Sequence, residues 1–177
     1  QDLWILLWVG VLGTFLNHIL FFLALLFAPA SHGAIIPPTT SPIWTVLLAT
    51  RLGRERVTAG QIGGMILCLV GVVLVVRPER LATSAEAFVL VGDLLFLLGG
   101  VAWGVYSYLS KVAMQRLSAV ATLTFGMSVG TVFLAPAALV EWPWSALGAA
   151  GAMAWGALGF LTLAGTVLSF LWWNVAI

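Results

Sequence analysis

The sequence contains few charged residues and a single cysteine. Only 7% of its 177 residues are Asp, Glu, Lys or Arg, whereas soluble domains carry about 25%. One thiol, Cys68, excludes an intrachain disulfide and a thiolate metal cluster. The net charge of +1 provides no basic surface for nucleic acid. Motifs for zinc proteases, phosphate loops and cysteine–histidine metal sites are also missing, so we expect neither a metal nor a cofactor.

Hydrophobic side chains, in contrast, make up 62% of the residues, and the mean hydropathy is +1.14. They form six runs, most of them about as long as the 20 residues that an α-helix needs to cross a bilayer core of about 30 Å. The predicted fold class is therefore all-α, a polytopic membrane helix bundle. Its predicted spans are Leu3–Ala28, Gly33–Thr50, Val57–Val76, Ala87–Ser110, Leu117–Val140 and Ala146–Ile177.

The positions of Lys and Arg predict the orientation of the spans, because these residues are more frequent in cytoplasmic loops. One side of the predicted bundle carries Arg51, Arg54, Arg56, Lys111 and Arg116, and the other side only Arg77 and Arg80. We therefore expect the N-terminus and the Arg51–Arg56 loop in the cytoplasm. Two aromatic belts are then expected, an outer one at Trp142 and Trp144 and an inner one near Trp4 and Trp173.

Two distant segments resemble each other. Gly13-Thr14-Phe15-Leu16 is echoed by Gly165-Thr166-Val167-Leu168, five spans later. An odd separation makes the two copies cross the membrane in opposite directions, as in the inverted repeats of secondary transporters, whose binding sites lie near the bilayer midplane. A five-span period predicts about ten helices, with repeats divided here into residues 1–80 and 81–177. Because the chain begins and ends in apolar runs, we expect it to hold helices three to eight.

Two of the predicted spans have unusual faces. The second span carries three prolines beside three hydroxyl residues. It is either a broken helix that lines a polar cavity or a kinked helix whose free carbonyls bond to neighbours. The fourth span has small and aromatic residues on one face, which predicts either a helix–helix seam or a pocket wall. That face consists of Gly92, Phe96, Gly99, Trp103, Tyr106 and Ser110.

Polar side chains within the spans are candidate functional residues, because hydrocarbon does not tolerate them without a partner. Asn17 and His18 could bind cargo, and His18 could carry a proton, or both could make interhelical hydrogen bonds. Asp93 is either an ion-coupling residue or, if its helix begins near Gly92, an interfacial residue at a helix N-terminus. His32 is expected in a solvated outer turn. The candidate substrate-binding residues are Asn17, His18, Thr40, Ser41, Trp103, Tyr106, Ser169 and Asn174, and the candidates for ion coupling are His18 and Asp93.

Short motifs then suggest a family. Arg51-Leu52-Gly53-Arg54-Glu55-Arg56-Val57, followed by Gly63-Gly64 and Gly71-Val72-Val73, resembles the end of the first repeat of EamA-type transporters, which belong to the drug/metabolite transporter superfamily. Gly92-Asp93-Leu94-Leu95 and Ala102-Trp103-Gly104-Val105-Tyr106 resemble the opening of their second repeat. The resemblance implies ten helices, a cytoplasmic N-terminus and export or exchange of small metabolites.

We therefore interpret the sequence as part of a secondary transporter and not as an enzyme. It would move a small metabolite, amino acid or drug-like compound by alternating access, as an exporter in the bacterial cytoplasmic membrane. The expected partners are the small-molecule substrate and the lipid bilayer, with a homodimer as one alternative for the assembly. Two other functions stay open. One is an intramembrane hydrolase that uses Ser128 with His18 or His32, and the other is a membrane scaffold that transports nothing.

The hydrolase alternative rests on Gly126-Met127-Ser128-Val129-Gly130, which matches the G-x-S-x-G pattern of nucleophilic hydrolases. That pattern functions in a strand–turn–helix setting, whereas this stretch is predicted to be a membrane helix. Ser128→Ala should therefore leave the transport rate of the full-length protein unchanged in proteoliposomes. Loss of a hydrolytic activity in this variant would instead support the hydrolase.

Overall fold

The structure is a computed structural model that describes residues 2–53, 55–76, 84–141 and 148–176. Every regular element within these residues is a helix, which confirms the all-α prediction. The elements are α1 (Asp2–Gly10), the π-helical η1 (Val11–Leu16), α2 (Asn17–Leu25), α3 (Ala30–Arg51), α4 (Ala59–Val76), α5 (Ser84–Ala113), α6 (Ala119–Glu141), α8 (Ala152–Phe160), the π-helical η3 (Leu161–Leu168) and α9 (Ser169–Ala176).

Five helical segments in the described residues are long and apolar enough to cross a membrane. They are α1 to α2, α4, α5, α6 and α8 to α9, so the chain is an integral multi-pass membrane protein. The remaining predicted span, α3, has 22 residues but is less hydrophobic because Pro, Ser and Thr occupy its first half. The predicted orientation residues Arg54, Arg77 and Arg80 and the outer-belt residues Trp142 and Trp144 lie outside the described residues.

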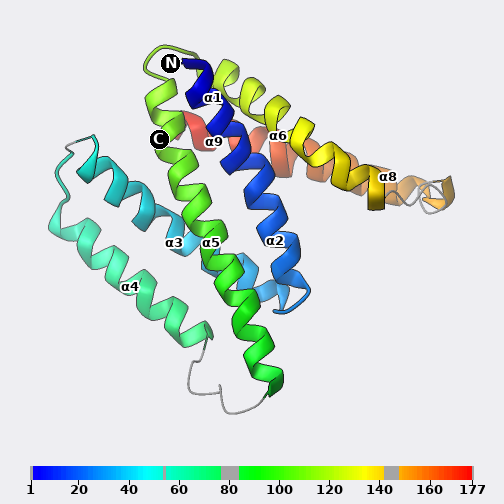
Figure 1. The fold of residues 1–177 in the computed structure, drawn as a ribbon, viewed down its shortest axis with the longest axis horizontal. Helices are drawn as coiled ribbons and strands as arrows, with labels where there is room; N and C mark the ends of the chain where they lie inside the picture. The colour runs from blue at the N-terminus through cyan, green and yellow to red at the C-terminus, as the bar shows by residue number, and fades with distance from the viewer. Residues whose placement is uncertain (1, 54, 77–83, 142–147, 177) are drawn as a thin grey trace.

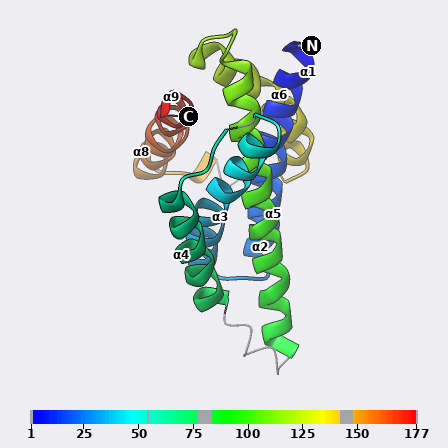
Figure 2. The same cartoon turned by 90° about the vertical axis from the view of Figure 1, so that its left-hand side faces the viewer.

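The helix α5 lies in the middle of the molecule, with α1 and α2 on one side and α4 on the other, and α3 begins beside α2 and crosses α5 toward α4 (Figure 1). Its glycines allow the neighbouring backbones to come close. A Cβ added at Gly104 would lie 2.5 Å from the Cβ of Trp44 and 2.8 Å from the backbone oxygen of Ser41. In lipid, apolar side chains gain little by leaving the acyl chains, so close packing at small residues is what holds helices together. The helix α4 packs on α3, farther from α5 (Figure 2).

The contacts along α5 fix the direction of the first apolar segment. Gly13 packs against the ring of Tyr106, and Ala28, just after α2, packs against Gly92. From the first contact to the second, the residue number rises in the first segment and falls in α5. The segment from α1 to α2 therefore runs antiparallel to α5.

The last apolar segment runs the other way. Phe170 of α9 packs against Trp103, with ring centroids 4.9 Å apart, and Asn174 bonds to Tyr106. These contacts make α9 parallel to α5, and hence opposite in direction to α1 and α2. This is the relation that an inverted repeat requires.

The two echoed segments share an unusual backbone. Gly13 to Leu16 lies in η1, Gly165 to Leu168 lies in η3, and each π-helical stretch ends at the leucine of the echo. The π-helix is rare and often occurs at functional sites. The short sequence similarity therefore coincides with the same local departure from α-helical geometry in both segments.

A methyl group at Gly104 tests the packing between α3 and α5. Gly104→Ala should lower the thermal unfolding temperature of the full-length protein, because the added Cβ meets the backbone of α3 and overpacking costs about 1–3 kcal/mol. Gly64→Ala on α4 is the matched control, since nothing lies within 4 Å of its added Cβ. Alanine should raise helix stability there by about 0.5–1 kcal/mol. Equal unfolding temperatures for the two variants would contradict this packing.

Candidate functional site

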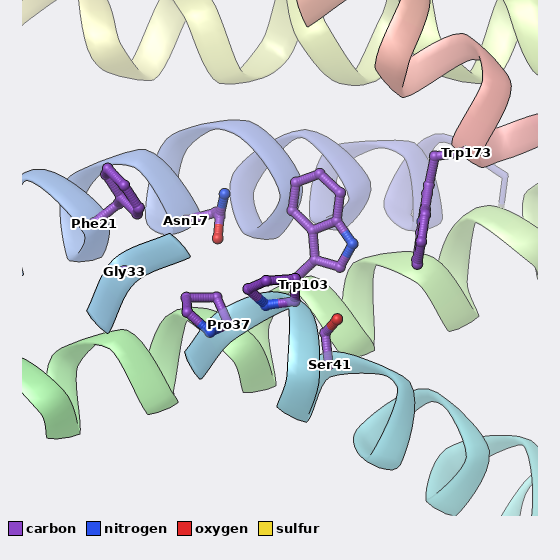
Figure 3. A pocket seen from close by; sticks show the side chains of 8 residues that line it. Asn17, Phe21, Gly33, Pro37, Ser41, Trp103 and Trp173 are labelled. Carbon is purple, nitrogen blue, oxygen red and sulfur yellow. The ribbon is translucent and has the colours of Figure 1, made fainter. Parts of the chain in front are cut away.

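A pocket of about 340 Å³ lies between α2, α3, α5 and α9 (Figure 3). This volume falls in the range of small-molecule sites, about 300–1,000 Å³. None of the described residues that line it carries a charge. The lining residues are Asn17, Phe21, Gly33, Pro37, Pro38, Ser41, Trp103 and Trp173.

Three polar groups around the pocket make no hydrogen bond within the described part of the chain. They are the amide of Asn17, the hydroxyl of Ser41 and the indole N–H of Trp103. An amide both donates and accepts, a hydroxyl does the same, and an indole nitrogen only donates. A polar group in an apolar setting is costly unless it finds a partner. The pocket therefore offers hydrogen bonds to a guest molecule from three different helices.

Aromatic rings form the apolar walls of the pocket. The ring of Trp103 lies 5.9 Å from that of Trp173, measured between centroids. The Nε1 of Trp173 donates to the hydroxyl oxygen of Ser107 at 3.0 Å, which fixes this indole against α5. Phe21 contributes the ring on α2. Flat, rigid rings of this kind favour a guest with a planar apolar part.

The prolines of α3 contribute to the same site without interrupting the helix. Residues Ala30–Arg51 form one continuous helix through Pro37, Pro38 and Pro42, so the broken-helix alternative is wrong. Because proline has no N–H, the carbonyls four residues earlier lose their usual helical partner. Two of these carbonyls belong to Gly33 and Pro38, both of which line the pocket.

The structure brings Asn17, Ser41 and Trp103 together and leaves the other candidate binding residues outside the pocket lining. The hydroxyl of Thr40 donates to the backbone oxygen of Ile36 at 2.8 Å and packs beneath Gly100 of α5. The exposed hydroxyl of Ser169 donates to the backbone oxygen of Ala164 at 2.8 Å. These two hydroxyl groups therefore donate their hydrogen bonds to backbone oxygens of their own helical segments.

His18 also bonds within its own segment. Its Nδ1 lies 2.6 Å from the backbone oxygen of Thr14, in the π-helical stretch. A carbonyl can only accept a hydrogen bond, so Nδ1 carries the proton and donates it. His18 follows Asn17 in sequence but lies about 100° around the helix, and the pocket lining includes only Asn17.

Tyr106 and Asn174 form a buried pair that joins α5 to α9. The Nδ2 of Asn174 donates to the hydroxyl oxygen of Tyr106 at 2.6 Å and to the backbone oxygen of Phe170 at 2.8 Å. Neither residue lines the pocket. The pair positions α9 so that Trp173, the residue before Asn174, reaches the pocket.

Sequence reasoning did not name Phe21, Gly33, Pro37, Pro38 or Trp173 as binding residues, although it offered the second span as one possible wall of a cavity. Phe21 follows Asn17 by four positions, so helical periodicity could have found it on the same face. Trp173 was expected in an aromatic belt, whereas in the structure its ring turns inward against Trp103. Its direction depends on contacts between α5 and α9, which no local sequence pattern reveals.

Asp93 and His32 differ most from expectation. The helix α5 begins at Ser84 and not near Gly92, so Asp93 lies inside the helix and is only 1% exposed. Its Oδ1 lies 2.7 Å from Nδ1 of His32, which is half-buried in the first turn of α3. The helix start expected near Gly92 and the solvated turn expected for His32 are therefore both wrong.

Comparisons with known proteins agree with a membrane transporter. The sequence profile of the EamA-like transporter family matches residues 1–77 and 90–177. The chain is 29% identical to the uncharacterized transporter YyaM of Bacillus subtilis (strain 168) over 169 residues, which cover 96% of this chain and 55% of YyaM. It is 24% identical to the uncharacterized transporter YetK of the same organism over 173 residues, 98% of this chain and 52% of YetK. The chain thus spans about half the length of these relatives.

A more distant organism provides a partial match. The thiamine-repressible mitochondrial transport protein THI74 of Saccharomyces cerevisiae (strain ATCC 204508 / S288c) is 37% identical over 76 residues, which cover 41% of this chain and 20% of THI74. No solved structure matches the chain.

The Tyr106–Asn174 pair should be structural. Tyr106→Phe removes the oxygen that accepts from Asn174 but keeps the ring. The stability of the full-length protein should therefore fall by about 0.6 kcal/mol, the average measured for such bonds in membranes, and by no more than about 1.7 kcal/mol. Ligand affinity should stay the same. Thermal unfolding and ligand binding of the same preparation measure both effects. A tenfold loss of affinity at unchanged stability would instead assign Tyr106 to the binding site.

Proposed function

Because the chain belongs to the EamA-like transporter family, we propose that it forms part of a secondary transporter whose substrate binds in the pocket between α2, α3, α5 and α9. One observation carries the proposal. The unpaired polar groups of Asn17, Ser41 and Trp103 converge on one pocket of a suitable size for a small molecule. Inside a membrane protein such groups need a partner, and a passing substrate provides one.

The lining of the pocket supports an amphipathic substrate. Burying a net charge without a counter-charge is costly, and no charged side chain is among the described lining residues. Two indoles and Phe21 favour a flat apolar part, and the amide and hydroxyl groups favour a polar part. We therefore propose a small metabolite, amino acid or drug-like compound that has both parts and little or no net charge.

The proposed mechanism is alternating access between two repeats, residues 1–80 and 81–177. The two ranges matched by the family profile and the opposite directions of the first and last apolar segments support it. The pocket draws Asn17 and Ser41 from the first range and Trp103 and Trp173 from the second. Rocking of one half against the other would then expose a substrate held between them to each side in turn.

Further parts of the proposal concern the whole protein. We propose ten helices, export, and the bacterial cytoplasmic membrane with the Arg51–Arg56 loop inside, and the similarity to Bacillus proteins supports a bacterial membrane. We assign no catalytic role to the chain. A homodimer stays a prediction.

Substrate uptake into proteoliposomes tests the proposed site. A compound is first selected by its ability to raise the unfolding temperature of the full-length protein. Asn17→Ala should then lower kcat/KM for that compound about tenfold, because a hydrogen bond to an uncharged group contributes roughly 1.4 kcal/mol. His18→Ala is the matched control, since His18 is adjacent but outside the pocket lining.

Two outcomes would contradict this proposal. Equal uptake by Asn17→Ala and the wild type would show that the substrate does not bind in this pocket during transport. If the wild-type protein moves none of the compounds that it binds, the non-transporting scaffold gains support.

A further inference from the structure

A second polar contact lies beside the pocket and is not used by the proposed binding site. The Oδ1 of Asp93 lies 2.7 Å from Nδ1 of His32. The side chain of Asp93 is 1% exposed and that of His32 is 18% exposed. The other carboxyl oxygen of Asp93, Oδ2, is buried and has no hydrogen-bond partner. A buried carboxylate is normally satisfied at both oxygens, so this one is unusual.

No further charged group among the described side chains pairs with either member. The helices α2 and α3 pack on α5 around this site, and α4 packs on α3. The hydrogen bonds and ion pairs of the structure join none of the other titratable groups on these helices to His32 or Asp93. The described groups are His18, Arg51, Cys68, Tyr106, Tyr108 and Lys111, whereas Glu86, also on α5, lies outside the described side chains.

We propose that His32 and Asp93 together form a proton-binding site. When the pair holds one proton in addition to a neutral imidazole and a carboxylate, its net charge is zero. That proton lies either on the ring, which gives imidazolium and carboxylate, or on the carboxyl group, which gives imidazole and carboxylic acid. Release of that proton to water leaves Nδ1–H donating to Oδ1 and a net charge of −1 on a buried group. Among the described side chains no cation accompanies this charge, and burying an uncompensated charge is costly.

The position of the pair connects proton binding to the pocket. His32 precedes Gly33, which lines the pocket, and a Cβ at Gly33 would lie 2.6 Å from the ring of Phe96. Phe96 in turn packs on Phe21, another lining residue, with centroids 5.4 Å apart. The His32–Asp93 contact therefore holds the first turn of α3 onto α5 directly beside the pocket.

Proton binding and the packing of the first turn of α3 on α5 should therefore stabilise each other. Loss of the proton would favour separation of α3 from α5 at this end, where Asp93 could reach water. This coupling rests on the proposed function, because it links proton release to substrate access. By thermodynamic linkage, a substrate that binds one arrangement more tightly would change the proton affinity of the pair. The factor equals the one by which proton binding changes the substrate affinity.

The exposed ion pair at the other end of the α3–α5 contact provides a control. The Nζ of Lys111 lies 2.9 Å from Oε1 of Glu55, but the two side chains are 41% and 51% exposed. Exposed pairs contribute little to stability. Glu55→Gln therefore removes a carboxylate without disturbing a buried charge.

Thermal unfolding of the full-length protein between about pH 5 and about pH 8, where histidine titrates, tests the site. Asp93→Asn keeps an oxygen for Nδ1–H but cannot change its protonation. If the folded state holds the proton more tightly than the unfolded state, wild-type stability falls relative to Asp93→Asn as pH rises. The unfolding constant should change by up to tenfold per pH unit, the limit for one proton. Glu55→Gln should follow the wild type.

Parallel curves for the wild type and Asp93→Asn would overturn the proton site. Should Asp93→Asn fail to fold, infrared difference spectra of the wild type at stepped pH replace it. A buried carboxyl or imidazole band that changes with pH, and persists in Glu55→Gln, supports the site, and its absence overturns it. These readouts need no substrate. A failure of substrate uptake would therefore count against the proposed function and leave this result unaffected.

Discussion

The close approach of α2 and α3 to the glycines of α5 is the constraint on which the rest of the structure depends. Lipid removes most of the hydrophobic driving force between helices, so contact area and backbone proximity must replace it. Gly92 meets the backbone near Ala28, and Gly104 meets the backbone of Ser41. Between these contacts, Phe96 and the bulky Trp103 occupy the same helix. Tight contacts at the glycines and large rings between them leave a pocket where the helices cannot close completely.

The π-helical stretches show why polar residues in a membrane helix need not bind a substrate. The hydroxyls of Thr166 in η3 and Ser169 at the start of α9 donate to backbone oxygens five residues earlier, at 3.3 Å and 2.8 Å. In the first segment, the ring of His18 donates to the backbone oxygen of Thr14. A change in helical pitch alters which backbone groups pair, and nearby side chains then donate hydrogen bonds to the backbone carbonyls. The polar groups left without such a bond, as at Asn17, are the informative ones.

Much of the architecture could be predicted from the sequence, because apolar length alone determines which segments can cross a bilayer. Three pocket residues, Asn17, Ser41 and Trp103, were also predictable as unusual side chains on apolar helices. The contact between His32 and Asp93 was not, since 61 positions separate the two residues and only the packing of α3 on α5 joins them. The inward direction of Trp173 depends likewise on the bond between Asn174 and Tyr106.

The accessibility of a cysteine at position 41 tests the central claim, the proposal that a substrate binds in the pocket between α2, α3, α5 and α9. Ser41 and Thr40 are equally buried, at 2% exposure, but only Ser41 lines the pocket. Each is replaced by cysteine in full-length protein from which other cysteines, including Cys68, have been removed. Small water-soluble thiol reagents should modify Ser41→Cys and not Thr40→Cys, and a transported compound should slow that modification. If Ser41→Cys is as unreactive as Thr40→Cys, or reacts at the same rate with and without the compound, the account is contradicted.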